Sequence, residues 1–481
     1  MQALARDANA GIVIPGAYYR QGDSVLFQAD FTDANKKSLV QTVGPISALA
    51  TAPLTGVERL RQQVIAGLAP LVDSALFMQA SLIARPPSLE AYREFLQGEA
   101  QFYGDELGAV EHYLRAAAQD TTYALPLLRA LIALNNAGDL ARYDSVKRVV
   151  ASRRARLTPF EQAYFDYAGC DNGERCVSAT AAMVRLTPNS QFTAYLHAVT
   201  LRWANKPHAT DSILRGLDPM SGELRGRIYL PHHHAAVLHI LGEHVRERIV
   251  VRAGRAQYPG RLYLAIDEIR VLIALGQLGE ALRAIDAMFT LAPELKTSTL
   301  SFGVIAMYEL RWHGHAAEAD VLGAKLRRRA EAQPSLVDHA SRAATDTRGR
   351  LELLAAMHRW PELEASRGDL LTSDPANIVA LRLRGVAFAM QGKRALALGV
   401  DSTLASATTS ERLVDHCYLG TIPGSCRRVA RAYIAAALGD KARAVSLLDV
   451  RTFNDISAHY DLMGEWLRDY PPFQEFVKPR G

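Results

Sequence analysis

Cysteine, aromatic residues and long apolar runs are all scarce in this sequence. Only four of the 481 residues are Cys, and aromatic residues make up 7% of the chain. No apolar run is long enough for a transmembrane helix, and the N-terminus lacks a basic region followed by an apolar segment. We therefore expect any export or membrane attachment to depend on sequence upstream of Met1.

Motifs of nucleotide-binding and kinase sites are missing as well. The chain contains no HRD-type catalytic loop, no DFG, no GxxxxGK[ST] sequence and no GxGxxG sequence. The spacing of Ser, His, Asp and Glu residues along the sequence identifies neither a Ser-His-Asp arrangement nor a buried pair of carboxylates. We predict that the chain is not an enzyme and binds no cofactor, although a deep pocket with converging titratable residues would revive an enzymatic interpretation.

The charge is weakly basic and spread over a large surface. The formal net charge is +5, and short arginine runs occur at Arg153–Arg154 and at residues 327–329. No basic stripe alternates with aromatic residues. We interpret the runs as solvated helix faces and helix C-termini instead of a nucleic-acid site, and we expect no nucleic-acid partner.

The chain does contain a sequence motif that recurs about every 34 residues, a period typical of stacked helical hairpins. Its clearest copy, IRVLIALGQLGEALRAIDAMFTLAP, runs from Ile269 to Pro293. Gly276 allows the left-handed turn that ends a first helix, Ala281 lets two helices approach closely, and Pro293 stops the second helix.

The same register returns along most of the sequence. Asp171, Asn205 and Trp360 stand where the pattern expects the turn glycine. The other residues that define the repeat are turn glycines and the small residues five positions after them: Gly138, Gly242, Gly314, Ala319, Gly392, Ala397, Gly439 and Ala444.

These residues make the chain resemble a tetratricopeptide repeat (TPR) protein over residues 88–455. The resemblance implies a mainly α fold, an α-solenoid of about ten helical hairpins, with residues 456–481 as a C-terminal capping segment. It also implies a concave surface for peptide or protein partners. The alternative is a non-repeating helical bundle in which the glycines and alanines recur by chance.

The first 87 residues differ in pattern from the repeats. Residues 11–43 predict three short strands, in which Val25, Phe27, Ala29 and Phe31 alternate with polar or small neighbours. A helix is expected from about Leu54, with an apolar stripe through residues 57, 60, 64, 68 and 71. Residues 76–87 read as a linker.

The segment ARDANAGIVIPGAYYRQGDSVLFQADFTDA resembles the TolB-like amino-terminal domain that precedes TPR arrays in many bacterial signalling proteins. We assign residues 1–75 to a partial, truncated α/β domain of this kind, because the family's opening strand and helix would lie before Met1. The resemblance implies a serine/threonine kinase domain and one membrane-spanning helix upstream. An unpaired sheet edge would then favour self-association.

The four cysteines form two local pairs, Cys170 with Cys176 and Cys417 with Cys426. Both spacings can close a disulfide, and free thiols or a zinc site are the alternatives. Pairs that flank turns, with no cysteine left over, favour disulfides. Because disulfides persist outside the cytoplasm, they favour an extracytoplasmic, periplasmic location, with a cytoplasmic one as the alternative.

Histidines offer the sharpest candidates for a metal site. Residues 232–234 are consecutive His, followed by His239 and His244. We interpret them as a hydrated helix start with partly buried side chains, because no HExxH motif or nearby Cys completes a set of ligands, and we predict no metal. Trp312, His313 and His315 are expected to be packing and surface residues.

The sequence thus predicts a protein-binding and sensing module of a bacterial signalling protein. A free-standing periplasmic scaffold for envelope assembly or secretion is one alternative. A cytoplasmic regulatory module of a cyclase or transcription factor is the other.

Overall fold

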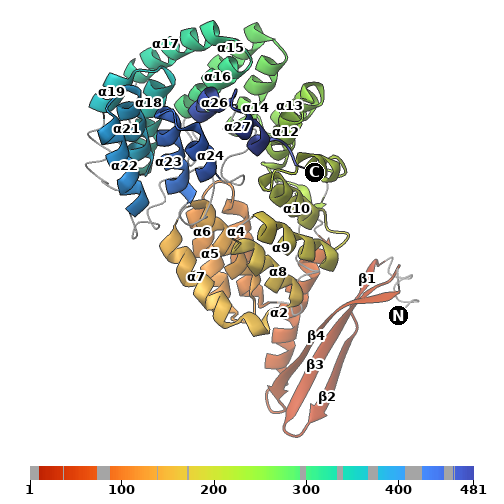
Figure 1. Cartoon of the computed structure of the whole chain (residues 1–481). Coiled ribbons are helices and arrows are strands. Elements are labelled where there is room, and N and C mark those ends of the chain that lie inside the picture. Colours follow the sequence, from red (N-terminus) through yellow and green to blue (C-terminus); the bar gives the residue numbers. More distant parts are fainter. Residues whose placement is uncertain are drawn as a thin grey trace. The chain divides into compact units, whose positions relative to one another are not determined.

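The computed structural model describes residues 10–35, 37–72, 87–137, 139–170, 173–220, 222–292, 299–332, 340–366, 378–406, 425–448, 459 and 461–480. Figure 1 shows the whole chain, which divides into two compact units. The first unit comprises Met1–Gly169, Ala182–Thr193 and Met220–Arg225. The second unit comprises Cys170–Ala181, Ala194–Pro219 and Gly226–Gly481.

The first unit opens with a four-stranded antiparallel sheet. Its central strand is β3, which pairs with each of the other three strands. Phe27, Ala29 and Phe31 of β3 are buried, as their alternation predicts. The strands are β1 (Ile12–Val13), β2 (Gly16–Gln21), β3 (Ser24–Asp33) and β4 (Ser38–Leu49).

Helix α2 (Pro53–Val72) packs on β3 and β4. A Cβ atom on Gly56 would lie 2.6 Å from the ring of Phe27 and 2.8 Å from Ala48, so the helix approaches the sheet through this glycine. The predicted apolar stripe is wrong at its first position, because Val57 lies beside the contact and is 44% exposed.

The rest of the first unit is helical, and its core contains a polar network. Arg129 donates to both carboxylate oxygens of Glu99, and Tyr113 donates to one of them at 2.6 Å. Burial without these partners would be costly for all three groups. The elements are α4 (Leu89–Gln101), α5 (Glu106–Gln119), α6 (Leu125–Ala137), α7 (Leu140–Ser152), η2 (Arg154–Arg156), α8 (Pro159–Ala168) and η3 (Gly222–Leu224).

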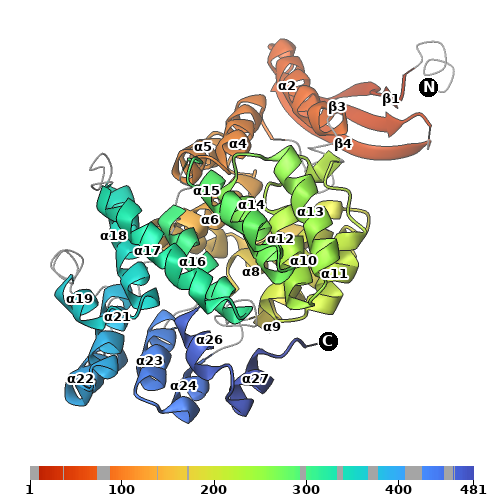
Figure 2. The ribbon, with the colours of Figure 1, turned by 90° about the horizontal axis from the view of Figure 1, so that it is seen from above.

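The second unit consists of consecutive helix pairs, stacked in chain order from α12 to α24 (Figure 2). Helices α9 (Gly173–Leu186) and α10 (Gln191–Trp203) have residues in both units. The remaining helices are α11 (Pro207–Arg215), α12 (Leu230–Ile240), α13 (His244–Gln257), α14 (Leu262–Ala274), α15 (Leu278–Met288), α16 (Thr299–Trp312), α17 (Ala316–Ala332), α18 (Ala340–Ala356), α19 (Trp360–Ala365), α21 (Ile378–Met390), α22 (Arg394–Ser406), α23 (Ser425–Ala437), α24 (Lys441–Leu447), α26 (Leu462–Leu467) and α27 (Pro471–Val477).

One turn geometry joins the two helices of each pair. The second helix begins two residues after a residue with positive φ, and the intervening residue donates its backbone N–H five residues back. At Gly276, for example, φ is +71° and Gln277 donates to the carbonyl of Leu272 at 2.8 Å. In these turns the residues with positive φ are Asn205, Gly242, Gly276, Gly314, His358, Gly392 and Gly439.

The turn assigned to Trp360 is therefore misplaced by two residues. His358 has the positive φ, at 57°, and Trp360 is the first residue of α19. The side chain of Trp360 is buried in the core and does not form the turn. Gly138, Asp171 and Pro293 lie outside the described residues.

The predicted fold class is confirmed: the chain is mainly α, with TPR-like helix pairs after a small N-terminal sheet. The small residues five positions after Gly276, Gly314, Gly392 and Gly439 are fully buried where the helices of a pair meet, whereas Glu247 stands five positions after Gly242. These small residues are Ala281, Ala319, Ala397 and Ala444. The boundaries predicted at residues 75, 87 and 455 stay predictions.

Candidate functional site

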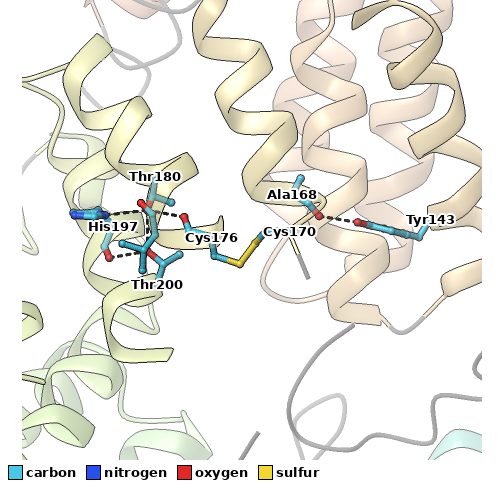
Figure 3. The surroundings of a disulfide bond; sticks show 8 residues. Tyr143, Ala168, Cys170, Cys176, Thr180, His197 and Thr200 are labelled. Carbon is cyan, nitrogen blue, oxygen red and sulfur yellow. Dashed lines mark hydrogen bonds between the residues drawn. A yellow bond between two sulfur atoms is a disulfide. The ribbon is translucent and has the colours of Figure 1, made fainter. Parts of the chain in front are cut away.

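A disulfide joins Cys170, which follows α8, to Cys176 in the first turn of α9 (Figure 3). The two Cα atoms are 5.3 Å apart, within the range that a disulfide requires. On the α9 side, the hydroxyl of Thr180 donates to the carbonyl of Cys176 and lies 2.9 Å from Nδ1 of His197. The second predicted pair is described only in part: Cys426 is disulfide-bonded, and Cys417 lies outside the described residues.

A cleft of about 370 Å³ lies in the second unit, between the α16–α17 hairpin and residues on and next to α26. The indole of Trp312 lies between two other residues that line the cleft. The imidazole of His459 stacks on the indole with centroids 4.5 Å apart, and the guanidinium carbon of Arg468 lies 4.9 Å from the indole centroid. The lining residues are Tyr308, Arg311, Trp312, Ala316, Asp320, His358, His459, Asp461, Glu465 and Arg468.

Charges of both signs line this cleft. Arg311 forms ion pairs with Asp320 at 2.9 Å and with Glu465 at 3.5 Å. Asp461 accepts a hydrogen bond from the buried hydroxyl of Tyr433, and burial raises the pKa of the Asp461 carboxyl. The cleft therefore combines an aromatic surface with groups that can pair with either sign of charge.

A buried cluster of imidazoles and carboxylates lies next to the cleft and shares His459 with it. His239 is at the C-terminal end of α12, Glu309 is on α16, and His313 follows α16 directly. The side chains of His239 and Glu309 have no exposed surface, whereas those of His313 and His459 are 21% and 11% exposed. The cluster thus reaches from the core to the wall of the cleft.

The nitrogens of three histidines converge on one carboxylate oxygen. From Oε1 of Glu309, Nε2 of His239 is 2.9 Å away, Nε2 of His313 is 3.1 Å away and Nδ1 of His459 is 3.4 Å away. Nε2 of His239 and Nδ1 of His459 are 3.3 Å apart. These four atoms lie within 4.8 Å of one another and could hold a metal ion.

Two further groups fix the orientation of the cluster. Nδ1 of His239 donates to the carboxylate of Glu247, whose Oε2 also accepts from His244 at 2.9 Å. The second oxygen of Glu309 accepts from Nε of Arg270 at 3.1 Å. Every charged group of the cluster therefore has a partner of opposite charge.

The surroundings shift the pKa of the central groups in different directions. Burial and the charge of Arg270 would lower the pKa of His239, but Glu247 and Glu309 outweigh them and raise it to about 9. Burial would raise the pKa of Glu309, but His239 and Arg270 hold it well below its usual value. Burial lowers the pKa of His459 to about 4, so this imidazole is neutral at neutral pH.

Each of the three consecutive histidines near the start of α12 contacts a charged side chain. His232 lies 2.8 Å from Asp267, His234 lies 3.0 Å from Asp211, and Nδ1 of His233 accepts from Arg202. The three side chains are partly or fully buried, as expected, but they contact charged side chains and do not form the hydrated helix start that we predicted.

Sequence reasoning missed Glu309 and His459, and it treated His313 as a packing or surface residue. Glu309 and His313 do carry one local signal, because a spacing of four lets His313, directly after α16, contact Glu309 one turn earlier. His459 gives no such signal, since 220 residues separate it from His239. The cluster forms only through tertiary folding.

The N-terminal sheet bears on the predicted self-association. All six residues of β2 are exposed, including Tyr18 at 79% and Tyr19 at 50%. Association through this sheet stays a prediction. Among the described helices, none combines the length and apolar character needed to cross a membrane.

No protein-family model matches the sequence, and no curated protein matches it. A solved structure that aligns with the chain is the crystal structure of the P58(IPK) TPR domain, at 9% sequence identity. The alignment covers 81% of this chain and 99% of that one, with a TM-score of 0.19. At this TM-score the alignment carries no argument about function, and the TPR-like character of the chain rests on its own helix pairs.

Proposed function

We propose that this chain is a protein-binding module that takes a peptide segment of a partner protein into the cleft beside Trp312. The observation that carries the proposal is the cleft itself, about 370 Å³ in volume and lined by aromatic residues and by charges of both signs. Its volume falls within the range of about 300–1,000 Å³ that is usual for ligand pockets. A peptide offers apolar side chains for the indole surface and polar groups for the charged rim.

The pairing of the charged groups favours binding over catalysis. The carboxyl groups of Asp320, Asp461 and Glu465 each have a hydrogen-bond or ion-pair partner. A general acid or base needs access to a substrate proton, and these carboxyl groups are held by neighbouring side chains. Partner binding would replace the exposed ion pairs, such as that of Asp320, at little cost.

In the full proposal, the chain is the extracytoplasmic sensing part of a bacterial signalling protein. The sequence resemblance of residues 3–73 to TolB-like domains supports this context, and the disulfide of Cys170 and Cys176 supports the compartment. Partner binding would then change the arrangement of kinase domains encoded upstream. The sequence upstream of Met1 distinguishes this proposal from a periplasmic scaffold. A kinase domain and a transmembrane segment there would support the signalling proposal, whereas a signal peptide without them would contradict it.

Selection from a displayed peptide library, with the untagged chain as bait, tests the binding proposal. Peptides that bind the cleft should lose at least about tenfold in affinity for the Arg468→Ala variant, because Arg468 covers one side of Trp312. Arg283→Ala removes an exposed arginine of α15 and serves as the matched control. Selection of no peptide, or of peptides that bind both variants equally, contradicts the proposal.

A further inference from the structure

The cluster around Glu309 has the composition and geometry of a metal site. Two ligand atoms on a tetrahedral zinc ion, each about 2.0–2.1 Å from the metal, are about 3.3 Å apart. Four of the six separations among the ligand atoms of His239, Glu309, His313 and His459 range from 2.9 to 3.4 Å, and all six are within 4.8 Å. An ion placed among these atoms needs only small movements of the side chains.

We propose that His239, Glu309, His313 and His459 bind one divalent transition-metal ion, with Zn²⁺ as the best match. Three imidazoles and one carboxylate are nitrogen and oxygen ligands that suit zinc. Four protein ligands close the coordination sphere, so the ion has a structural role. It fastens the segment that contains His459 to α12 and α16.

The groups behind the ligands are those that a metal site requires. The N–H of His239 Nδ1 points to Glu247, which fixes the ring and leaves Nε2 for the ion. Arg270 holds one oxygen of Glu309 and leaves Oε1, the atom on which the imidazoles converge. When the ion binds, the proton on Nε2 of His239 leaves to solvent.

The charges of the surrounding network agree with a divalent cation. Glu247, Glu309 and Asp267 bring three negative charges, and Asp267 lies 3.9 Å from Arg270. In the metal-bound state, in which the imidazoles are neutral, Arg270 balances one of these charges and two remain for the ion. A divalent ion compensates them in a place where an unpaired buried charge would be costly.

The metal site also completes the cleft. His459 stacks on Trp312, which lines the cleft, and Arg468 covers the same indole. An ion that holds His459 therefore holds one wall of the proposed peptide site in place. The metal proposal nevertheless stands on the ligand geometry and does not require that a peptide binds.

The test is metal analysis of the untagged full chain, since a histidine tag would bind zinc itself. We expect one zinc ion per folded chain after chelator treatment and reconstitution, measured by elemental mass spectrometry. Substitution by Co²⁺ should give the intense visible absorption of tetrahedral coordination. Zinc should also raise the thermal midpoint of unfolding.

Variants separate ligands from neighbours. His313→Asn and His459→Asn should each weaken zinc binding by at least about a hundredfold, and Glu247→Gln by about tenfold to a hundredfold. His315→Asn changes a nearby histidine outside the proposed ligand set and should keep full affinity. Far-UV circular dichroism checks that each variant is folded.

Two results would overturn the proposal. One is a folded wild-type chain that binds no zinc at micromolar concentration, which would leave a cluster held by protons and ion pairs alone. The other is equal zinc affinity in the wild type and in folded His459→Asn.

Discussion

Cys170, which follows α8, and Cys176 of α9 are six positions apart and already joined in the folded chain. At the scale of residues, this bond is the feature that bears most directly on where the protein resides. A short loop closed by a disulfide is stable where thiols are oxidised and is reduced by the thiol systems of the cytoplasm.

Peptide mapping of native protein, alkylated without reduction, should therefore find Cys170 bridged to Cys176 and Cys417 bridged to Cys426. Intact mass should show no alkylated cysteine before reduction and four after it. Four alkylated thiols in unreduced material would place the array inside the cell and favour the cytoplasmic regulatory module.

Residue chemistry was only partly predictable. The spacing of Cys170 and Cys176 is local, so the sequence pattern could suggest their bond. The contact of His239 with Glu309 joins residues 70 positions apart, and no spacing rule reaches that far. Glu309 also sits in an apolar stretch of α16, where its spacing to His313 hints at one of its three imidazole neighbours and at neither of the others.

At the scale of elements, the turn between paired helices follows one rule. Glycine marks this turn in the sequence because it enters the left-handed region without strain. Asn205 and His358 adopt the same conformation with φ of 56° and 57°. Asn tolerates this region better than most residues, and the turn at Asn205 was predicted; the turn at His358 was assigned two residues too late, although histidine is also enriched in this region.

Gly276→Ala should destabilise the α14–α15 pair by about 1–2 kcal/mol, which is the cost of a left-handed conformation for a residue with a Cβ atom. No atom lies within 4 Å of the added Cβ, so strain and not a clash is the cause. Gly276→Asn should cost less. Urea denaturation followed by amide hydrogen exchange in α14 and α15 measures both effects.

The same substitution three residues later is the control. Gly279 is an exposed residue of helix α15, and alanine there should stabilise the helix by up to about 1 kcal/mol. Equal effects of Gly276→Ala and Gly279→Ala would contradict the assigned turn geometry.

At the scale of the whole molecule, contacts between distant parts of the chain close the second unit. The side-chain amide of Asn205 donates to the carbonyls of Val477 and Lys478, and Arg480 donates its backbone N–H to the carbonyl of Asn205. In an open solenoid each repeat contacts only its neighbours. Here residues more than 270 positions apart are hydrogen-bonded, which repeat periodicity could not predict.

Asn205→Gly should release α27 without disturbing the α10–α11 turn. Glycine keeps the positive φ but removes both side-chain hydrogen bonds, so amides of residues 471–480 should exchange at least about fivefold faster. Asn205→Ala should in addition weaken protection in α11, because alanine strains the turn. Unchanged exchange in residues 471–480 of Asn205→Gly would show that these bonds do not hold the segment.

The hydrogen bonds from Asn205 also set an order of events during translation. Helix pairs that touch only their neighbours can fold one after another as they leave the ribosome. The turn at Asn205 cannot gain its partners until residues 477–480 have emerged, some 270 residues later. In the meantime its amide must be satisfied by water or by a chaperone, and the nascent chain has a long interval in which it is open to proteolysis.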